Sequence, residues 1–429
     1  MNNDCFDIAI IGGGPAGYEA ALAAGKYGLK SLLVEGKSIG GTCLNVGCIP
    51  TKTYLHKAKT YDLIRKNINT SPELSEFSSL KNIKNSAQRV IKRMQLGMET
   101  SLKANNVVYV KENVVGFDAA TLITDQKNKF WFKNLIIATG TRPFIPEPLM
   151  NNNFYTNENI FELEELPASI SIIGGGAIGV EFAFFFSLLN VPVTLYETAP
   201  SILAYFDNDL IEEVRKLLKR QKVKILENTT PDMASLKKGI VLVATGRKAW
   251  FPETRLNLKL TTRGYIKTNA NFQTDTQNIF AIGDVNGLSL LAHSAADQGH
   301  QVLNYIAKKT VPKNKVIPGV IYTSPSITTI GLREKDITQK NLYKIIKINF
   351  GLSGKSQAED QTNGWVKVIT QKNILKGCQI FGHNSEDLIP LCSLAVEKEV
   401  PLEQFAELIY PHPSYCEVLR DAFQKALEI

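Results

Sequence analysis

Residues 6–17 read FDIAIIGGGPAG, and this stretch decides the fold expected for the chain. An apolar, β-branched run over 6–11 leads directly into a glycine-rich turn, and a helical pattern follows from Tyr18 to Tyr27. A second apolar run over 31–34 then ends at an acid, Glu35. A strand, a GxGxxG turn, a helix, a strand and an acid in this order are typical of a dinucleotide-binding βαβ unit.

The glycines of this turn have different expected tasks. We expect Gly12 to make the tight turn and Gly14 to let the backbone approach a pyrophosphate. Gly17 would allow close packing of helix against strand, and Glu35 would bind a ribose hydroxyl.

The same unit occurs a second time. An apolar run over 169–173 leads into a turn with glycines at 174, 176 and 179, and the next apolar run ends at Glu197. Gly12 and Glu35 are 23 positions apart, and so are Gly174 and Glu197. The chain is therefore predicted to carry two dinucleotide sites, the second formed by Gly174, Gly176, Gly179 and Glu197.

Glu197 also bears on the choice of nucleotide. A carboxylate at this position accepts hydrogen bonds from a free ribose 2′-hydroxyl and repels a 2′-phosphate. The residues that follow, Thr198-Ala199-Pro200-Ser201, include no arginine that could bind a phosphate. The second site is therefore expected to favour NAD over NADP.

Residues 40–52 read GGTCLNVGCIPTK and contain two cysteines, Cys43 and Cys48, five positions apart. Pro50 suits the first turn of a helix, because the N–H that proline lacks would be unpaired there. Cys48 would then lie near a helix N-terminus, where the helix dipole favours a thiolate.

The cysteine pair has two plainer interpretations, a buried structural pair and a zinc site. Free cysteines are often simply buried, but the dense run of glycine, proline and lysine around this pair argues against a purely structural role. A zinc site would need a second pair at ligand spacing. The remaining cysteines occur singly in the sequence, at Cys5, Cys378, Cys392 and Cys416, so no metal site is expected.

Bulk properties restrict the class of protein. A chain of 429 residues is expected to form two to four domains. No apolar run is long enough to span a bilayer, and the N-terminus has no secretory pattern. Six cysteines in so long a chain fit a reducing compartment, so we expect a cytoplasmic location. The net charge of +8 comes without a basic block interleaved with aromatic residues, so nucleic acid is not an expected partner.

Segment 40–52 resembles the redox-active disulfide segment of the pyridine nucleotide–disulfide oxidoreductases, in particular the members that oxidise dihydrolipoamide with NAD. The resemblance covers essentially the whole chain. It implies an α/β fold with two Rossmann-like dinucleotide-binding domains, for FAD and NAD, and a C-terminal α+β dimerisation domain. The implied division is 1–144 for the first part of the FAD domain with the redox disulfide, 145–270 for the NAD domain, 271–315 for a central FAD-binding segment, and 316–429 for the dimerisation domain.

The resemblance also assigns cofactor contacts outside the two glycine turns. Two apolar runs end in Ala-Thr-Gly, at 138–140 and 244–246, and resemble the points where the family's chain returns to each nucleotide. A further run ends in Gly-Asp at Asp284, which in the family binds the ribityl chain of FAD. The residues thereby expected at FAD are Gly41, Thr42, Lys52, Thr139, Gly140, Asp284 and Ala292, and Gly246 is expected at NAD.

The implied reaction is oxidation of a dithiol by a Cys43–Cys48 disulfide, followed by electron transfer through FAD to NAD. His412 matches the family's catalytic base, and Glu417, five residues later, matches the acid that orients it. Lys52 and Glu181 would form an ion pair near the flavin ring. The family's histidine comes from the other subunit of a homodimer. The implied partners are the lipoyl domains and acyltransferase core of a 2-oxo acid dehydrogenase complex, and the implied wider role is redox homeostasis of the cell.

The chain departs from the family pattern in two places. The stretch 227–239 is shorter than the β-meander usually found there, which leaves the affinity for NAD open, and residues 247–250 differ from the usual run. Glutathione and trypanothione reductases generally need NADP, which Glu197 disfavours. Mercuric reductases usually carry an extra C-terminal cysteine pair, which this sequence lacks, and transhydrogenases typically lack the central pair. A flavin-bearing assembly subunit with little turnover is the remaining alternative, and the complete Cys, Cys, His, Glu set argues against it.

Overall fold

The computed structural model describes residues 5–67, 76, 79–149, 154–232, 236 and 239–428. The chain forms two compact units, and each is described by itself. Unit 1 comprises Met1–Lys57, Ile68–Leu166 and Leu242–Lys313, and unit 2 comprises Ala58–Asn67, Pro167–Val241 and Asn314–Ile429. Within the described ranges, no helix has both the length and the apolar character that a bilayer crossing requires.

Unit 1 is built on a sheet whose parallel core begins with the first predicted strand. Strand β1 (Cys5–Ile11) pairs in parallel with β2 (Ser31–Val34) on one side and β6 (Lys129–Ile137) on the other. The sheet continues through β3 (Val108–Val110) beyond β2, and β15 (Ile279–Ala281) pairs with β6. These strands are short apolar runs because both faces of the sheet are covered.

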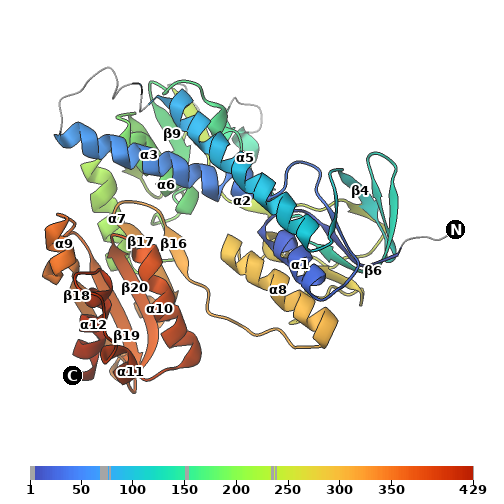
Figure 1. The fold of residues 1–429 in the computed structure, drawn as a ribbon. Helices are drawn as coiled ribbons and strands as arrows, with labels where there is room; N and C mark the ends of the chain where they lie inside the picture. Colours follow the sequence, from blue (N-terminus) through green and yellow to red (C-terminus); the bar gives the residue numbers. More distant parts are fainter. Residues whose placement is uncertain are drawn as a thin grey trace. The chain divides into compact units, whose positions relative to one another are not determined.

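Helices α1 (Pro15–Lys26) and α8 (Ala292–Lys308) pack closely against each other in this unit (Figure 1). Close packing is possible because the buried residues of α1 are all alanine or glycine. A Cβ atom at Gly299 of α8 would lie 2.6 Å from the carbonyl oxygen of Ala16. The GxGxxG turn that precedes α1 is thus held between a sheet and a closely packed helix pair.

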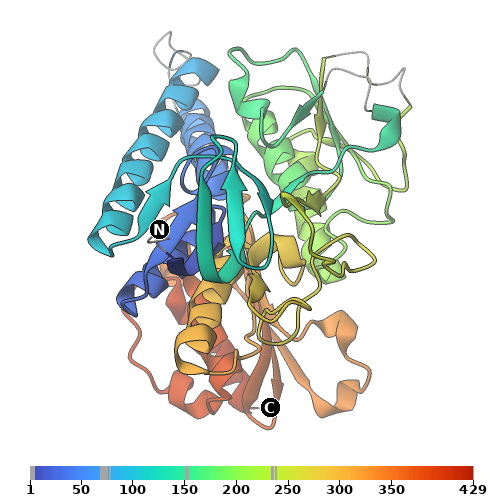
Figure 2. The same cartoon turned by 90° about the vertical axis from the view of Figure 1, so that its right-hand side faces the viewer.

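The rest of unit 1 consists of smaller strands and three helices. The antiparallel strands β4 (Val114–Phe117) and β5 (Thr121–Thr124) extend the sheet beyond β6, and Figure 2 shows them in teal. Strand β14 (Glu253–Thr254) pairs with β4, β13 (Arg247–Ala249) pairs with β7 (Thr141–Pro143), and β12 (Ile240–Val243) pairs with β8 (Tyr155–Thr156). The helices are α2 (Gly41–Val46), α5 (Leu80–Ala104) and the first part of α3 (Cys48–Asn67), whose residues Ala58–Asn67 belong to unit 2.

The start of α3 at Cys48 confirms the helix predicted behind the cysteine pair. Most of the stretch between α3 and α5 lies outside the described residues. Short 3-10 turns occupy Glu147–Leu149, Ile160–Glu162, Gly283–Asn286, Glu334–Asp336, Lys340–Leu342 and Phe350–Leu352.

The second glycine turn starts the dinucleotide-type half of unit 2. Strand β10 (Val193–Tyr196) pairs in parallel with β9 (Ile170–Ile173) and β11 (Lys224–Leu226). Helix α6 (Ala177–Leu188) follows the turn, and helix α7 (Asn208–Arg220) follows β10. The βαβ unit predicted from the second GxGxxG pattern is therefore confirmed. Part of the shortened stretch 227–239 lies outside the described residues.

The other half of unit 2 is an antiparallel sheet of order β16-β17-β20-β19-β18. Its strands are β16 (Gly319–Ile321), β17 (Ser326–Gly331), β18 (Lys344–Asn349), β19 (Trp365–Gln371) and β20 (Ile374–Gly382). Helices α10 (Ser385–Lys398) and α12 (Cys416–Glu428) pack on this sheet, with the shorter α9 (Gly354–Ala358) and α11 (Leu402–Ala406) beside them (Figure 1). This mixture of antiparallel strands and helices agrees with the α+β fold predicted for the C-terminal part of the chain.

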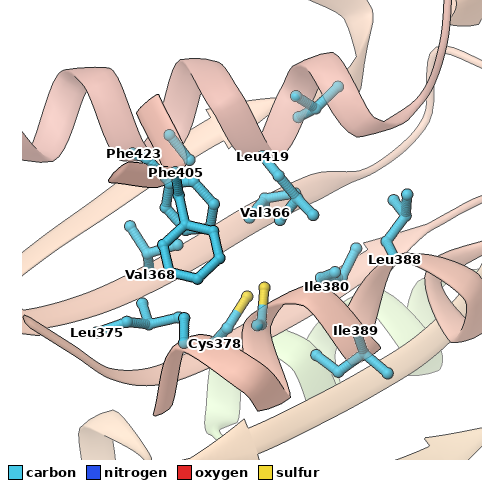
Figure 3. Close-up of a cluster of buried hydrophobic side chains, with 14 of the residues drawn as sticks. Val366, Val368, Leu375, Cys378, Ile380, Leu388, Ile389, Phe405, Leu419 and Phe423 are labelled. Atoms are coloured by element: carbon cyan, nitrogen blue, oxygen red, sulfur yellow. The ribbon is translucent and has the colours of Figure 1, made fainter. Parts of the chain in front are cut away.

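The core beside this sheet contains two cysteines that occur singly in the sequence and lie next to each other in the fold. Cys378 on β20 and Cys392 on α10 are both fully buried among the apolar side chains of Figure 3. Burial raises the pKa of the Cys378 thiol, and its hydrogen bond with Cys392 raises it further. Both cysteines are free thiols that contribute to an apolar core.

Candidate active and cofactor sites

The first glycine turn has the backbone geometry that its sequence predicts. Gly12 has a φ of +104°, and a Cβ atom there would lie 2.4 Å from the carbonyl oxygen of Ala138. A Cβ atom at Gly17 would lie 1.9 Å from the carbonyl oxygen of Gly12. At Gly14 the nearest atom would be 4.0 Å away, so the backbone is open there to a ligand at the N-terminus of α1.

Glu35 closes this turn from the end of β2. Its carboxylate accepts hydrogen bonds from the backbone N–H of Gly13 at 2.8 Å and of Lys37 at 2.8 Å. The side chain therefore lies beside the turn, where the sequence places a ribose-binding acid.

The first Ala-Thr-Gly segment lies at the end of β6. Gly140 has a φ of +70° and open space where a Cβ atom would stand. The hydroxyl of Thr139 donates to the carbonyl oxygen of Trp250, and the N–H of Trp250 donates to the carbonyl oxygen of Gly140 at 3.2 Å. The segment is thereby tied down on one side and open on the other.

Asp284 lies in the 3-10 turn that follows β15, and Ala292 is the first residue of α8. Burial raises the pKa of the Asp284 carboxyl, while a hydrogen bond from Thr141 and the charge of Arg247 act in the opposite direction. A carboxylate held here can accept hydrogen bonds from the hydroxyl groups of a bound ligand.

Together these features fit FAD. The open backbone at Gly14 and Gly140 offers room for a pyrophosphate and for close approach of a ligand, and Glu35 and Asp284 supply acceptors for its hydroxyl groups. The residues that would hold FAD are Gly12, Gly14, Gly17, Glu35, Gly41, Thr42, Lys52, Thr139, Gly140, Asp284 and Ala292. Bound FAD would supply two-electron redox chemistry.

The second glycine turn repeats the geometry of the first. Gly174 has a φ of +112°, and a Cβ atom at Gly179 would lie 1.9 Å from the carbonyl oxygen of Gly174. At Gly176 no atom lies within 4 Å of such a Cβ position. The backbone at Gly176 is therefore open in the same way as at Gly14.

Glu197 repeats the role of Glu35. Its carboxylate accepts from the N–H of Gly175 at 2.7 Å and of Ala199 at 2.7 Å. The arrangement fits the adenosine half of NAD, because the acid lies beside the turn and no arginine follows it. Gly246, the other residue expected at NAD, belongs to unit 1, and its φ of +114° and open Cβ position suit a close approach.

The cysteine pair lies where α2 ends and α3 begins. Cys43 is partly buried on α2, and Cys48 is exposed at the first position of α3. A hydrogen bond with Cys48 raises the pKa of the Cys43 thiol, and burial raises it further, while the positive charge of Lys52 lowers it. The two side chains are thus close enough to interact, as a redox pair requires.

Two residues that the sequence analysis missed hold this segment. The amide nitrogen of Asn45 donates to the carbonyl oxygens of Ser38, Ile39 and Gly41, at 3.3, 3.1 and 2.8 Å. Its amide oxygen accepts from Nε2 of Gln95, on α5, at 2.6 Å. Asn45 lies between the cysteines, which was a usable signal, but nothing in the sequence connects Gln95 to it.

His412 and Glu417 are brought together in unit 2, as predicted. Nδ1 of His412 lies 3.0 Å from Oε1 of Glu417, whose Oε2 accepts from the N–H of Ser414 at 2.9 Å. The hydrogen bond from Ser414, followed by that from His412, lowers the pKa of Glu417. A carboxylate at Nδ1 selects the tautomer with the proton on Nδ1 and leaves Nε2 as the basic nitrogen. The imidazole is 77% exposed, so Nε2 is accessible to a substrate.

The remaining predicted residues are divided between the units. Lys52 is in unit 1 with the cysteine pair, whereas Glu181 is in unit 2 with His412 and Glu417. Glu181 is buried on α6, and its Oε1 accepts from the N–H of Tyr322 at 3.1 Å. The Lys52–Glu181 ion pair and the supply of His412 by a second subunit stay predictions.

Comparison with known proteins identifies the family of the chain. Residues 6–299 match the family model for pyridine nucleotide-disulphide oxidoreductases, and residues 317–423 match the dimerisation domain of the same family. The chain belongs to the pyridine nucleotide–disulphide oxidoreductase family. The predicted family and fold class are therefore confirmed, as is the presence of a dimerisation domain.

Relatives of this oxidoreductase cover nearly the whole chain. It is 33% identical to a dihydrolipoyl dehydrogenase of Mycoplasma pneumoniae, over 98% of each chain. It is 31% identical to a dihydrolipoyl dehydrogenase of Geobacillus stearothermophilus, over 98% of this chain and 96% of the relative.

Solved structures show the same fold at lower identity. LpdA from Mycobacterium tuberculosis superposes with a TM-score of 0.87 at 20% identity, covering 97% of this chain and 99% of its own. The HOCl-induced flavoprotein disulfide reductase RclA from Escherichia coli superposes with a TM-score of 0.86 at 22% identity, covering 97% of this chain and 99% of its own.

Proposed function

We propose that this oxidoreductase oxidises dihydrolipoamide to lipoamide and reduces NAD, with FAD as its bound cofactor. The supporting observation is the pair of interacting thiols, Cys43 and Cys48, on a segment that touches the first glycine turn. A Cβ atom at Gly41, the first residue of α2, would lie 2.7 Å from Cα of Gly14. The names of the full-length relatives agree with this activity.

The thiol chemistry starts at His412. Nε2 of His412 takes the proton from one thiol of dihydrolipoamide, because only a thiolate attacks a disulfide. The thiolate attacks Sγ of Cys43 in the oxidised pair, the bond between the two cysteines breaks, and Cys48 leaves as a thiolate. The second substrate sulfur then attacks the substrate sulfur of the mixed disulfide, and its proton passes to the departing Sγ of Cys43, which releases lipoamide and the Cys43 thiol. The substrate has lost two electrons and two protons, and the cysteine pair has gained the two electrons.

FAD, held by the residues around the first glycine turn, would supply the redox chemistry that connects the reduced cysteine pair with NAD. Within the protein, the charge of Lys52 acts on the Cys43 thiol and opposes the effects that raise its pKa. Because its pKa is lowered, Glu417 is ionised at neutral pH and accepts the hydrogen bond from Nδ1 of His412. It therefore holds His412 in the tautomer that removes protons and stabilises the charged imidazole afterwards.

The wider setting is proposed as follows. The chain acts as a homodimer through its dimerisation domain, and the lipoyl domains and acyltransferase core of a 2-oxo acid dehydrogenase complex are its partners. The division into segments 1–144, 145–270, 271–315 and 316–429 and the cytoplasmic location stay predictions from the sequence.

A substrate panel tests the proposal. Purified protein is assayed with dihydrolipoamide, glutathione disulfide and mercuric ion, each with NAD(H) and NADP(H), and the bound flavin is measured by absorbance. We expect turnover with dihydrolipoamide and NAD. Turnover with glutathione disulfide and NADPH would favour a glutathione-type reductase, and bound flavin without turnover of any substrate would favour an assembly subunit.

A further inference from the structure

We propose that Arg247 is a positioning residue for the FAD site, acting on Asp284 through the hydroxyl of Thr141. The inference rests on the proposed role of Asp284 as a ligand of FAD. Arg247 belongs to the run 247–250, which differs from the usual family pattern. All residues of the argument belong to unit 1.

Arg247 makes four hydrogen bonds with its guanidinium group. Nε donates to Oγ1 of Thr141 at 2.7 Å, and Nη2 donates to the carbonyl oxygen of the same residue at 2.6 Å. Nη1 donates to Oδ1 of Asn157 at 2.9 Å, and Nη2 also donates to Oε1 of Glu158 at 3.0 Å. The side chain is only 10% exposed, so water is a poor substitute for these partners.

The donors of Arg247 fix the direction of the hydrogen bond to Asp284. Oγ1 of Thr141 lies 3.2 Å from Oδ2 of Asp284. A guanidinium group can only donate, so Oγ1 of Thr141 must accept from it. The hydroxyl proton of Thr141 is then directed to Oδ2 of Asp284, which acts as an acceptor. Oδ1 of the same carboxylate is left for hydroxyl groups of a ligand.

The turn that carries Asp284 is also tied to the backbone of Arg247. The hydroxyl of Tyr265 donates to the carbonyl oxygen of Arg247 at 3.2 Å. The ring of Tyr265 packs on Gly287, where a Cβ atom would lie 2.4 Å from it. The N–H of Gly283, at the other end of the turn, donates to Oε1 of Gln298 at 2.8 Å. The turn that carries Asp284 is therefore linked to Arg247 twice, through Thr141 and through Tyr265, and Gln298 holds its first residue.

An effect of Arg247 on FAD binding through Asp284 can be distinguished from a role in which Arg247 only stabilises the strand pair β7–β13. If Arg247 acts through the carboxylate, its loss weakens FAD binding only where Asp284 is present. If it merely supports the strands, its loss weakens binding by the same factor in any background. A double-mutant cycle of Arg247→Met with Asp284→Asn therefore decides between the two.

The experiment titrates FAD into apoprotein prepared from the full chain and follows the quenching of flavin fluorescence. We expect Arg247→Met to weaken FAD binding about tenfold, as loss of a hydrogen bond to a charged group does. In the Asp284→Asn background the same change should alter the affinity less than about twofold. Arg247→Lys should restore only part of the loss, because an ammonium group lacks the planar fork of donors. The matched control is Lys248→Met, an exposed neighbour on the same strand whose ammonium lies over the ring of Phe144.

If the Arg247→Met variant does not fold, a smaller substitution at Thr141 tests the same link to Asp284. Thr141→Val keeps the shape and removes the hydroxyl, and Thr141→Ser keeps the hydroxyl, so only the valine variant should weaken FAD binding. Equal factors for Arg247→Met in both backgrounds, or normal binding by Thr141→Val, would overturn the inference. Unchanged FAD affinity of Asp284→Asn alone would instead refute the proposed role of Asp284.

Discussion

The two glycine turns of this oxidoreductase have nearly the same local geometry and different surroundings. In each, the first glycine has a positive φ, the third would clash with the carbonyl of the first, and an acid accepts from two backbone N–H groups. The helix after the first turn buries only alanine and glycine. The helix after the second turn buries a run of phenylalanines, Phe182, Phe184, Phe185 and Phe186.

The two turns also differ in the segment that lies beside each of them, and this second difference decides which turn can serve the thiol chemistry. The first turn has the cysteine segment beside it, because Gly41 lacks a Cβ atom, which would lie 2.7 Å from Cα of Gly14. At the second turn, the Cβ position of Gly176 has no protein atom nearby. The same backbone device is thus used twice, and the segment packed next to it determines the chemistry.

The largest expected effect is loss of turnover without loss of nucleotide binding, and it would show that the cysteine pair and the two glycine turns have separate tasks. Cys48→Ser should lower turnover of dihydrolipoamide by about a thousandfold or more, because no disulfide can form and covalent catalysis is lost. The variant should still bind FAD and NAD, since neither turn is altered. Turnover is measured by NADH formation, FAD content by absorbance, and NAD binding by calorimetry. Loss of FAD from this variant would show that the pair also supports the first turn.

A second effect concerns the base, which belongs to neither turn. Glu417→Gln should lower kcat by about a hundredfold, because the amide no longer stabilises the charged imidazole of His412. FAD content should be unchanged. A Km effect without a change in kcat would contradict the orienting role.

Glu417 also predicts a dependence of stability on pH. Its pKa in the folded protein is lowered, so its contribution to stability is present above the unfolded pKa of about 4.3 and is lost as pH falls through the lower, folded pKa. The difference in Tm between the wild type and Glu417→Gln should therefore be present at neutral pH and disappear in strong acid. A difference that persists unchanged below the folded pKa would argue against this ionised carboxylate.

The third effect tests the comparison directly. Gly14→Ala should reduce FAD affinity by about tenfold or more, and Gly176→Ala should raise the Km for NAD by a similar factor, because each methyl group enters space meant for a pyrophosphate. Both backbones have a negative φ and room for a Cβ atom, so the apoproteins should fold normally. Circular dichroism checks the fold. If Gly14→Ala affected NAD and Gly176→Ala affected FAD, the assignment of the two turns would be reversed.

The smallest effect concerns the anchor of the cysteine segment beside the first turn. Gln95→Ala removes the donor to Asn45 and should destabilise the protein by about 1 kcal/mol, as loss of a partly buried hydrogen bond does. Chemical denaturation of apoprotein measures it. Ser101→Ala, which removes a side-chain hydrogen bond to Gly97 within one turn of α5, is a control from the same helix. A larger effect for the control would show that Gln95 contributes little.

Much of this arrangement could be predicted from the chain. The strand–turn–helix–strand order, the residue at which α3 begins, and the contact between His412 and Glu417 all depend on residues close together in the sequence. The link between Thr141 and Arg247 joins residues 106 positions apart, and the one between Thr141 and Asp284 spans 143. No periodicity or motif indicates such contacts, because Thr141 and Arg247 are ordinary polar residues of short strands, and the Gly-Asp pattern that marks Asp284 does not indicate its protein partners.

The sequence by itself determined where the chain can turn tightly and where two sulfurs lie within reach, since backbone conformation and short spacings are local properties. Only the tertiary structure decided which distant residues support those places: Gln95 behind Asn45, Arg247 behind Asp284, and Cys392 beside Cys378. The physical reason is that the packing of whole strands and helices brings these residues together. The packing energy is a sum over many residues, so no single sequence position indicates which distant residue it will contact.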